Sequence, residues 1–332
     1  MITGASQADA AILVVSGKKG EMEVGIAANG QTREHAYLAQ TLGVKQLVVA
    51  INKADVWDYD EDRFNECKES VSQLLRNIGF PVKKIPFIPT SGMTGETLSD
   101  LSDKMPWYDG PTLLEAIDKF EVPDKPTDKP LRLPIQDAYK IKGTGVVPVG
   151  RVESGVLKKG DKIIIMPTEF KGEIRSIEMH HEEIPMAEPG DNIGFSIRGI
   201  TLKDVSRGDC LGHQDNVPTV VTPKGKWTGQ IIVIWHPTAV GVGYTPVVHA
   251  HTAQVAARFS ALLKKLDQKT GAVIEDSPKF LKKNEAAIVE MIPIKKLCIE
   301  KYTEIPEMGR FAVRDMGRTV AVGIIKELET GL

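Results

Sequence analysis

Hydrophobic positions in the first third of the chain follow two alternating spacings. Residues 10–15 (AAILVV) and 46–51 (QLVVAI) are largely apolar runs, as in strands that are buried on both faces of a sheet. Residues 31–42 and 62–78 repeat apolar positions every three or four residues, which predicts two helices. A glycine directly follows each of these two segments, so both helices are expected to end there.

Two later segments complete this alternation. Residues 85–89 (IPFIP) suit a short strand, and residues 112–119, which follow a proline, suit a last helix. Strands that alternate with helices predict crossover units and a parallel sheet. The first domain is therefore expected to span residues 1–121.

The pattern changes at a linker of residues 122–130 (VPDKPTDKP), which is rich in proline and charge. Short β-rich runs separated by Gly and Asp turns then fill residues 131–222, which suits a small antiparallel barrel. A second β-rich domain is assigned to residues 223–332. The expected fold class is α/β plus all-β, a parallel sheet followed by two antiparallel β-barrels.

Composition places the chain among ordinary globular proteins. Its 332 residues are 42% hydrophobic and 26% charged, which suits two or three domains. No apolar run approaches the roughly 20 residues that a membrane helix needs. The three cysteines are widely spaced without a CxxC pair, so neither a disulfide framework nor a zinc site is expected, and a cytoplasmic location is the simplest. The net charge of −2 neither indicates nor excludes a nucleic-acid partner.

The first candidate chemistry follows the strand at residues 46–51, where Asn52, Lys53 and Asp55 form the N-K-x-D pattern of a guanine reader. The Asp55 carboxylate can accept hydrogen bonds from the ring N–H and the exocyclic amine of guanine, a pair that adenine lacks. Asn52 could hold the loop and contact the base, and the stem of Lys53 could cover the ring. The location suits this role, because ligands in open α/β sheets bind beyond the carboxyl ends of strands. The match is short, however, and the alternative is a polar loop with Asp55 as a turn or cap residue.

A second element favours guanine binding. Ser91 and Gly92 follow the strand at residues 85–89, and the backbone amides of this turn could meet the guanine oxygen. The phosphate-binding loop of a GTP site has no counterpart, because its pattern G-x-x-x-x-G-K-[ST] occurs nowhere in the sequence. The one Asp-x-x-Gly sequence, residues 191–194, lies in the β-rich part and is expected to be a turn. This chain alone is therefore expected to be inactive in GTP hydrolysis.

Longer segments resemble one protein family. The matching segments include ITGASQADAAILVV, GQTREHAYLAQTLGVKQLVVAINKAD, TDKPLRLPIQDAYKIKGTGVVPVGRVESGVLKKGD and, most specifically, GRFAVRDMGRTVAVGIIKE. Nearly the whole chain resembles translation elongation factor 1-alpha, in particular its archaeal form, of the family that includes bacterial elongation factor Tu. In that family the phosphate loop and switch regions precede ITGASQADAA. The chain thus resembles a member without the first part of its GTPase domain.

The resemblance implies a partial P-loop GTPase-type sheet that binds guanine through Asn52, Lys53, Asp55, Ser91 and Gly92. It also implies GTP or GDP with Mg²⁺ as the ligands of a full-length member. The magnesium ligands, the phosphate lysine and the histidine that positions water have no counterpart here. No catalytic residue and no metal ligand is therefore assigned in this chain.

The resemblance further implies that the barrels hold the acceptor end of aminoacyl-tRNA. Glu178 resembles the residue near the terminal ribose, and Asn192 resembles the one that holds the esterified aminoacyl group. Without the resemblance, Glu178 would be a solvent-facing strand residue and Asn192 a turn amide. Candidates for contacts to the tRNA backbone are Arg310, Arg314 and Arg318, although arginines on strands are as often structural ion-pair partners.

Histidines supply one further pattern. His249 and His251 alternate on one expected strand, a spacing that could suit a metal. No third ligand is near in the sequence, so a packing role is favoured.

Three functions remain open at this point. The first is GTP-dependent delivery of aminoacyl-tRNA to the ribosome, with a guanine-nucleotide exchange factor as a further partner and no membrane. The second is a translational GTPase relative of the release-factor or ribosome-rescue type. The third is a non-catalytic scaffold in which the two barrels bind partner proteins.

Overall fold

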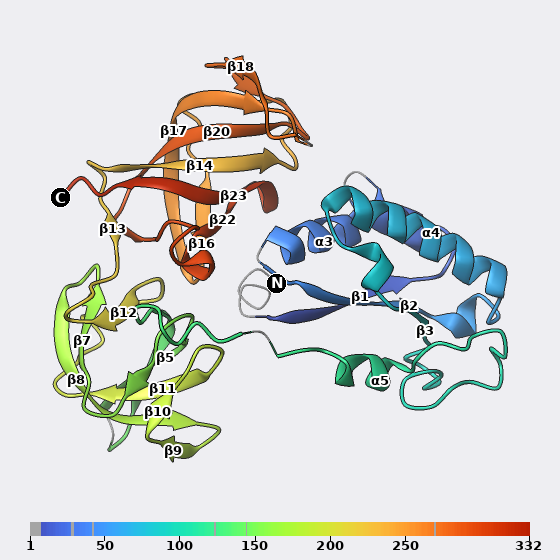
Figure 1. Ribbon diagram of the computed structural model, residues 1–332, viewed down its shortest axis with the longest axis horizontal. Helices are drawn as coiled ribbons and strands as arrows, with labels where there is room; N and C mark the ends of the chain where they lie inside the picture. The colour runs from blue at the N-terminus through green and yellow to red at the C-terminus, as the bar shows by residue number, and fades with distance from the viewer. Residues whose placement is uncertain (1–7, 28–29, 42, 123, 144, 269) are drawn as a thin grey trace. The chain divides into compact units, whose positions relative to one another are not determined.

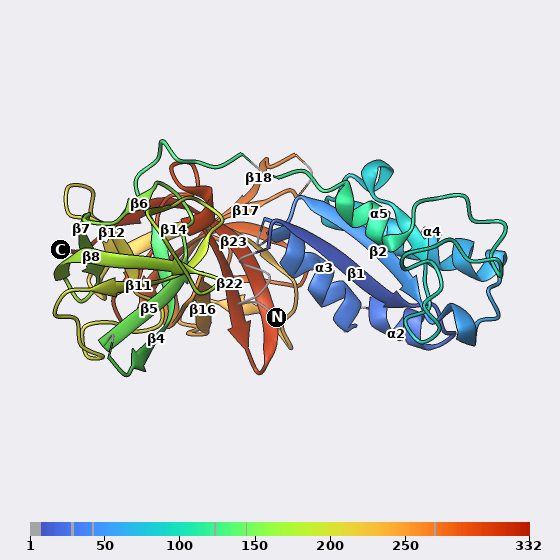
Figure 2. The same cartoon turned by 90° about the horizontal axis from the view of Figure 1, so that it is seen from below.

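The structure is a computed structural model in which residues 8–27, 30–41, 43–122, 124–143, 145–268 and 270–332 are described. The chain forms two compact units, Met1–Pro123 and Asp124–Leu332. Figures 1 and 2 show a sheet with helices in the first unit and two barrels in the second. Within the described ranges, no helix has both the length and the apolar character needed to cross a membrane.

The first unit is built on three parallel strands in the order β1-β2-β3. They are β1 (Ala10–Ser16), β2 (Gln46–Asn52) and β3 (Phe87–Pro89). The five inner residues of β2 are all buried, because helices pack on both faces of this central strand. The expected parallel α/β sheet is confirmed.

Helices cover the two faces of this sheet unequally. The helical segments are α2 (Glu21–Ile26), α3 (Gln31–Thr41), η1 (Ala54–Val56), α4 (Glu61–Ile78), η2 (Val82–Lys84) and α5 (Leu113–Asp118). Residues of α2, α3 and α4 share one core with Val49 and Ile51, whereas α5 packs on the opposite face, against Val48. On that second face Ile12 and Val14 of β1 stay 38% and 58% exposed.

The helix boundaries mostly follow the sequence signals. Helix α4 ends at Gly79, which adopts φ 106° and donates its N–H to the Leu75 carbonyl at 3.1 Å. Helix α5 starts one residue later than expected, because the Thr112 hydroxyl caps it by accepting the Glu115 N–H at 3.2 Å. The expected strand at residues 85–89 begins only at Phe87. Helix α2 was not predicted, since six residues are too few to show a helical period, and residue 42 lies outside the described residues.

The first barrel is a closed antiparallel sheet of six strands, ordered β11-β5-β4-β12-β7-β8 and closed by pairing of β8 with β11. Its strands and their short extensions are β4 (Leu133–Ile141), β5 (Gly145–Arg151), β6 (Leu157–Lys158), β7 (Lys162–Met166), β8 (Phe170–Met179), β9 (Glu182–Ile184), β10 (Met186–Ala187), β11 (Asn192–Ile197) and β12 (Cys210–His213). Asn192 is the first residue of β11. The expectation of a simple turn at residues 191–194 is therefore wrong, because the pairing of β11 with β5 begins at this residue.

The second barrel is also closed and six-stranded, ordered β16-β22-β23-β14-β20-β17 and closed by pairing of β16 with β17. Its elements are β13 (Val220–Val221), β14 (Lys226–Val233), β15 (Val240–Gly241), β16 (Val247–Ala250), β17 (Ala253–Leu266), β18 (Val273–Asp276), β19 (Phe280–Leu281), β20 (Ala286–Pro293), β21 (Leu297–Cys298), η3 (Pro306–Met308), β22 (Arg310–Asp315) and β23 (Arg318–Glu329). Trp227, Phe259 and Phe311 fill its core. Both expected barrels are confirmed.

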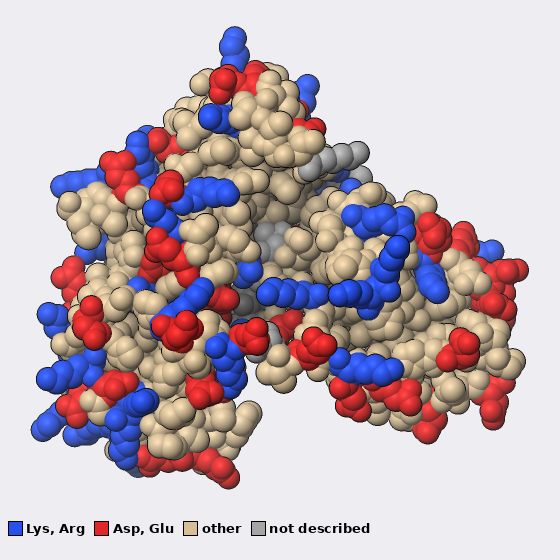
Figure 3. All heavy atoms as spheres, viewed as in Figure 1, with Lys and Arg blue, Asp and Glu red and all other residues tan. Residues whose placement is uncertain are grey.

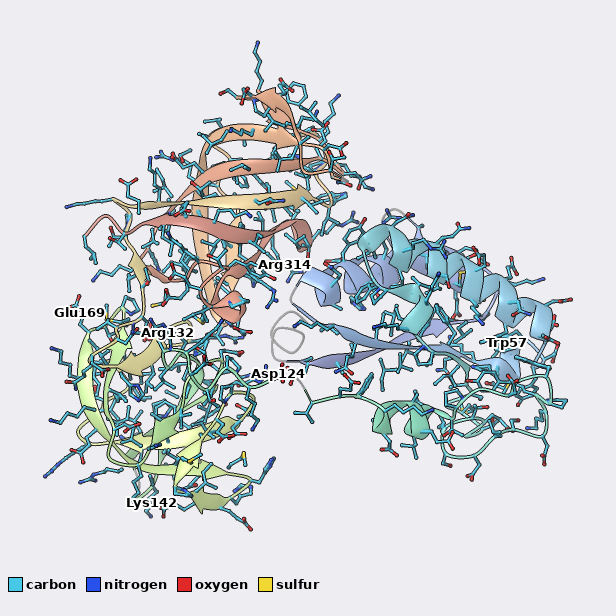
Figure 4. All side chains as sticks on the ribbon, viewed as in Figure 1. Trp57, Asp124, Arg132, Lys142, Glu169 and Arg314 are labelled. Atoms are coloured by element: carbon cyan, nitrogen blue, oxygen red, sulfur yellow. The ribbon has the colours of Figure 1, made fainter. Side chains whose placement is uncertain are left out.

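A buried ion pair joins the two barrels. Arg132 donates from Nε to Glu300 Oε1 at 2.6 Å, and both side chains are only 4% exposed. The remaining guanidinium hydrogens go to the carbonyls of Leu131 and Val217 and to two oxygens of Asn216. Figure 4 labels Arg132 among the strands of the first barrel. This network ties the two barrels together.

Candidate functional site

The expected guanine-binding residues meet at the carboxyl ends of two neighbouring strands. Asn52, Lys53 and Asp55 follow β2, and Ser91 and Gly92 follow β3. The two loops are joined by a backbone hydrogen bond of 3.0 Å from residue 54 to residue 90. Trp57, labelled in Figure 4, marks this end of the sheet. The structure therefore brings together all five residues that the sequence singled out.

Asp55 has one carboxylate oxygen engaged and one free. The Ser91 hydroxyl donates to Asp55 Oδ1 at 2.6 Å, and Oδ2 has no hydrogen-bond partner among the described residues. The Asp55 side chain is half-buried, so a ligand can reach it. A carboxylate oriented by a neighbouring hydroxyl and open on its other side can accept donors from the edge of a purine.

The amides of Ser91 and Gly92 serve a different purpose than expected. Asn52 Oδ1 accepts the Gly92 N–H at 2.9 Å, and the Ser91 N–H donates to the Glu96 carbonyl at 3.2 Å. Both amides thus hold the loop together and do not point freely at a base.

Lys53 is held from outside its own loop. Its backbone is left-handed, with φ 69°, and its Nζ lies 2.6 Å from Glu21 Oε2. The hydrogen bonds to Glu21 from Lys53, then from Ser16 and Lys18, lower the pKa of that carboxyl to about 2. Glu21 belongs to α2, the helix that the sequence did not predict.

A magnesium ion finds no ligand set in the described part of the chain. No group of three or more His, Cys, Asp or Glu side chains there could hold a metal. The loops at residues 52–55 and 91–92 offer hydrogen-bonding groups that suit a base and no ligand set that suits the metal, so no chemical step is derived through Mg²⁺.

The two expected aminoacyl-tRNA residues of the first barrel lie on adjacent strands. Glu178 of β8 pairs with Gly194 of β11, and Asn192 is two residues before Gly194, on the same face. Both side chains are exposed, and neither has a hydrogen-bond partner among the described residues. Gly194 has no side chain, which leaves a gap between them, and a Cβ there would touch Val147 Cγ1 at 3.4 Å and Val149 Cγ1 at 3.7 Å. The result is an acid and an amide beside an apolar floor of two valines.

The three candidate arginines of the second barrel lie on β22 and at the start of β23. The guanidinium of Arg310 lies 5.2 Å from the ring centre of Tyr302, and that of Arg318 lies 4.9 Å from the ring centre of Trp235. None of the three forms an ion pair with a described carboxylate. They rest on rings and on a turn carbonyl, which keeps their charge available for an anion.

Two arginines of the first barrel that the sequence did not single out, Arg207 and Arg151, act on histidines of the second barrel, and Arg151 is itself ion-paired, with Nη1 3.7 Å from Glu153 Oε2. Burial, followed by the nearby charges of Arg314 and Arg207, lowers the pKa of His249 to about 4. Burial is also the main cause that lowers the pKa of His251 to about 4, and the charges of Arg310 and Arg151 act in the same direction. Arginines of both barrels therefore act on these two histidines. Over the face that Figure 3 shows, acidic and basic side chains are interspersed.

Comparison with known proteins agrees with this three-part organisation. Residues 1–123 match the family described as elongation factor Tu GTP binding domain, residues 145–212 match elongation factor Tu domain 2, and residues 226–326 match GTP-eEF1A C-terminal domain-like. Elongation factor 1-alpha of Metallosphaera sedula is 56% identical over 99% of this chain and 75% of its own length. The protein of the same name from Saccharolobus solfataricus is 57% identical over the same shares. The chain belongs to the elongation factor 1-alpha family.

Two solved structures with lower sequence identity share this architecture. A crystal structure of sup35 complexed with GMPPNP is similar with a TM-score of 0.58 and 35% identity, covering 98% of this chain and 80% of that one. Sup35 complexed with GDP gives a TM-score of 0.57 and 36% identity. The higher identity to the elongation factors decides the family, and members of this family act in translation elongation.

Proposed function

We propose that this chain takes part in GTP-dependent delivery of aminoacyl-tRNA to the ribosome. In this proposal the loop at residues 52–55 reads guanine, and the outer face of the first barrel holds the aminoacyl end of the tRNA. The observation that carries the proposal is the unpartnered pair Glu178 and Asn192, set on adjacent strands with Gly194 between them.

The chemistry of that face suits the end of a charged tRNA. The Glu178 carboxylate can accept a hydrogen bond from a ribose hydroxyl, and the Asn192 amide can donate to the carbonyl of the aminoacyl ester. The gap above Gly194 gives room for the terminal nucleoside, whose apolar faces can rest on Val147 and Val149. Uncharged tRNA lacks the aminoacyl ester, so Asn192 is the residue that would distinguish the two forms.

Contacts to the tRNA backbone are assigned to cationic side chains. Arg310, Arg314 and Arg318 of the second barrel, together with the exposed Arg207 of the first, would meet phosphates whatever the tRNA sequence. Such contacts suit a carrier of many different tRNAs. Binding is expected to weaken steeply as salt is added.

The remaining partners follow from the family. The nucleotide is GTP or GDP with Mg²⁺, for which no ligand is assigned here, and the partners are the ribosome and a guanine-nucleotide exchange factor in the cytoplasm. GTP hydrolysis is not assigned to any residue of this chain.

Binding of charged tRNA to two variants tests the assignment of the first barrel. Glu178→Gln and Asn192→Ala should each weaken binding about tenfold, because the first replaces a charged acceptor by a neutral one and the second removes the amide donor. Glu173→Gln, an exposed residue of the same strand, is the matched control and should change nothing. If both variants bind charged tRNA as the unmodified chain does, this face is not the aminoacyl site.

A further inference from the structure

The loop that reads guanine is braced by a segment that lies far from it in sequence. The N–H of Gly17 donates to the Asn52 carbonyl at 2.8 Å, and Trp57 Nε1 donates to the same oxygen at 3.3 Å. Glu21, at the start of α2, holds the Lys53 ammonium at 2.6 Å. The turn at residues 16–20 and the first residue of α2 are thus the outer support of the loop.

This support is itself fixed by a buried arginine of α4. Arg63 is 4% exposed and donates from Nε to the Gly17 carbonyl at 2.7 Å. Its Nη2 lies 3.0 Å from Glu23, whose other oxygen accepts the Gly20 N–H. A third element therefore locks the turn and the start of α2 in place, and with them the carboxylate that meets Lys53.

Lys53 needs such a partner because its side chain is long and its backbone is left-handed. A free lysine side chain samples many rotamers, and restricting it on ligand binding costs free energy. The ion pair with Glu21 restricts it before any ligand arrives. The Ser16 hydroxyl, which donates to the same Glu21 oxygen at 2.7 Å, fixes the carboxylate in turn.

We propose that Glu21 is a positioning residue for guanine binding, which holds the Lys53 stem in place as one wall of the base site. This inference rests on the proposed function of the loop. Glu21 does not touch the base and acts only through Lys53. The site therefore extends beyond the two loop segments at residues 52–55 and 91–92 to the first residue of α2.

Titration of the full chain with guanosine, followed by NMR at the amides of residues 52–55, tests this proposal. Glu21→Gln should weaken guanosine binding about threefold, the modest factor expected for an ion pair that is 44% and 40% exposed. Glu61→Gln, an exposed residue in the first turn of α4, is the control and should bind as the unmodified chain does. In a Lys53→Met background Glu21→Gln should have no further effect, because its only route to the base has been removed.

The outcomes separate this inference from the proposed function. If the unmodified chain prefers guanosine to adenosine and Glu21→Gln does not alter the affinity, the role of Glu21 is overturned and guanine binding stands. An equal loss in the Lys53→Met background would show that Glu21 only supports the fold, which also overturns the inference. If the unmodified chain does not distinguish guanosine from adenosine, the guanine assignment and the role of Glu21 both fail.

Discussion

In the proposed guanine site, the base is selected by one side chain, Asp55. Its Oδ1 accepts the Ser91 hydroxyl, its Oδ2 is open, and a carboxylate oxygen accepts hydrogen bonds. Guanine offers two donors on the edge that would face this carboxylate. A change of one acceptor into a donor should therefore change which purine fits.

Asp55→Asn should reverse the preference from guanosine to xanthosine. The amide offers one donor and one acceptor, which match the ring N–H and the 2-oxo group of xanthine and clash with the 2-amino group of guanine. Guanosine affinity should fall by more than about tenfold, because a buried donor is left unpaired. NMR titration with both nucleosides measures this, with Asp58→Asn in the exposed part of the same loop as the control. A variant that still prefers guanosine would remove Asp55 from the base site.

At the residue scale, local motifs were predictable and long-range partners were not. Asn52, Lys53 and Asp55 are identified by their spacing, because a loop that reads a base places its groups within a few residues. Glu21 is 32 residues from Lys53, and no periodicity marks α2. The engagement of the Ser91 and Gly92 amides depends on three-dimensional loop closure, so it was not visible in the sequence.

At the element scale, the first barrel depends on the pairing of β8 with β11. Strand β8 lies in a segment that was expected to be β-rich, whereas the start of β11 was expected to be a turn, and a sequence does not state which strands close a barrel. The register places Glu178 opposite Gly194, and so beside Asn192. A shift of one residue would turn Glu178 to the other face and separate the pair.

Gly194 is the position where this geometry can be blocked without loss of the fold. Gly194→Leu should fill the gap between Glu178 and Asn192 and weaken charged-tRNA binding by more than about tenfold, since the terminal nucleoside would lose its place. Gly194→Ala adds a Cβ at ordinary contact distance from the two valines, so it is the matched control. Binding assays and urea unfolding of both variants provide the measurement. Unchanged binding by a folded Gly194→Leu chain would place the aminoacyl end elsewhere.

At the scale of the whole molecule, the Arg132–Glu300 pair makes the two barrels depend on each other. Thr219 also holds the Glu300 carboxylate, with its hydroxyl at 2.7 Å and its N–H at 3.1 Å. These partners are up to 168 residues apart in sequence, which explains why sequence patterns gave the barrels but not their junction.

Removal of the arginine alone should therefore be costly. Arg132→Met leaves the Glu300 carboxylate buried without its cation and should lower the free energy of unfolding by about 3–5 kcal/mol. The double change Arg132→Met with Glu300→Leu should recover part of this loss, because the uncompensated charge is gone. Lys159→Met, which breaks an exposed pair with Glu183, should cost less than about 1 kcal/mol and is the control. Urea unfolding measures these losses. Equal losses for Arg132→Met and Lys159→Met would contradict the role of Arg132 in joining the two barrels.

The two histidines near the same junction predict how stability depends on pH. The folded chain lowers the pKa of His249 and His251 to about 4, from an ordinary value of 6.5, so between these values the unfolded chain binds more protons. Stability from these groups is present above about pH 6.5 and is lost as the pH falls toward 4. Burial raises the pKa of Asp209 to about 6, so this carboxyl favours the folded state as the pH falls through part of this range. This single group opposes the two histidines.

Replacement of His251 tests that dependence. His251→Asn should reduce the loss of stability between pH 7.5 and pH 5 by at most about 2 kcal/mol, because one titrating group has been removed. His181→Asn is the control, since His181 is exposed and shares the positive φ of His251, at 67° against 53°. Chemical unfolding at both pH values measures the difference. An identical pH dependence in the His251 variant would show that burial of this ring does not govern acid stability.

The central claim, that the barrels hold the aminoacyl end of tRNA, is tested most directly by the spontaneous hydrolysis of the aminoacyl ester. The half-life of charged tRNA should lengthen as the chain is added, because the ester carbonyl on Asn192 is then shielded from water, and Asn192→Ala should abolish the effect. In a competition experiment, charged tRNA should bind the chain more tightly than deacylated tRNA does. An unchanged hydrolysis rate at concentrations where tRNA is bound, together with equal affinity for the charged and deacylated forms, would contradict the account.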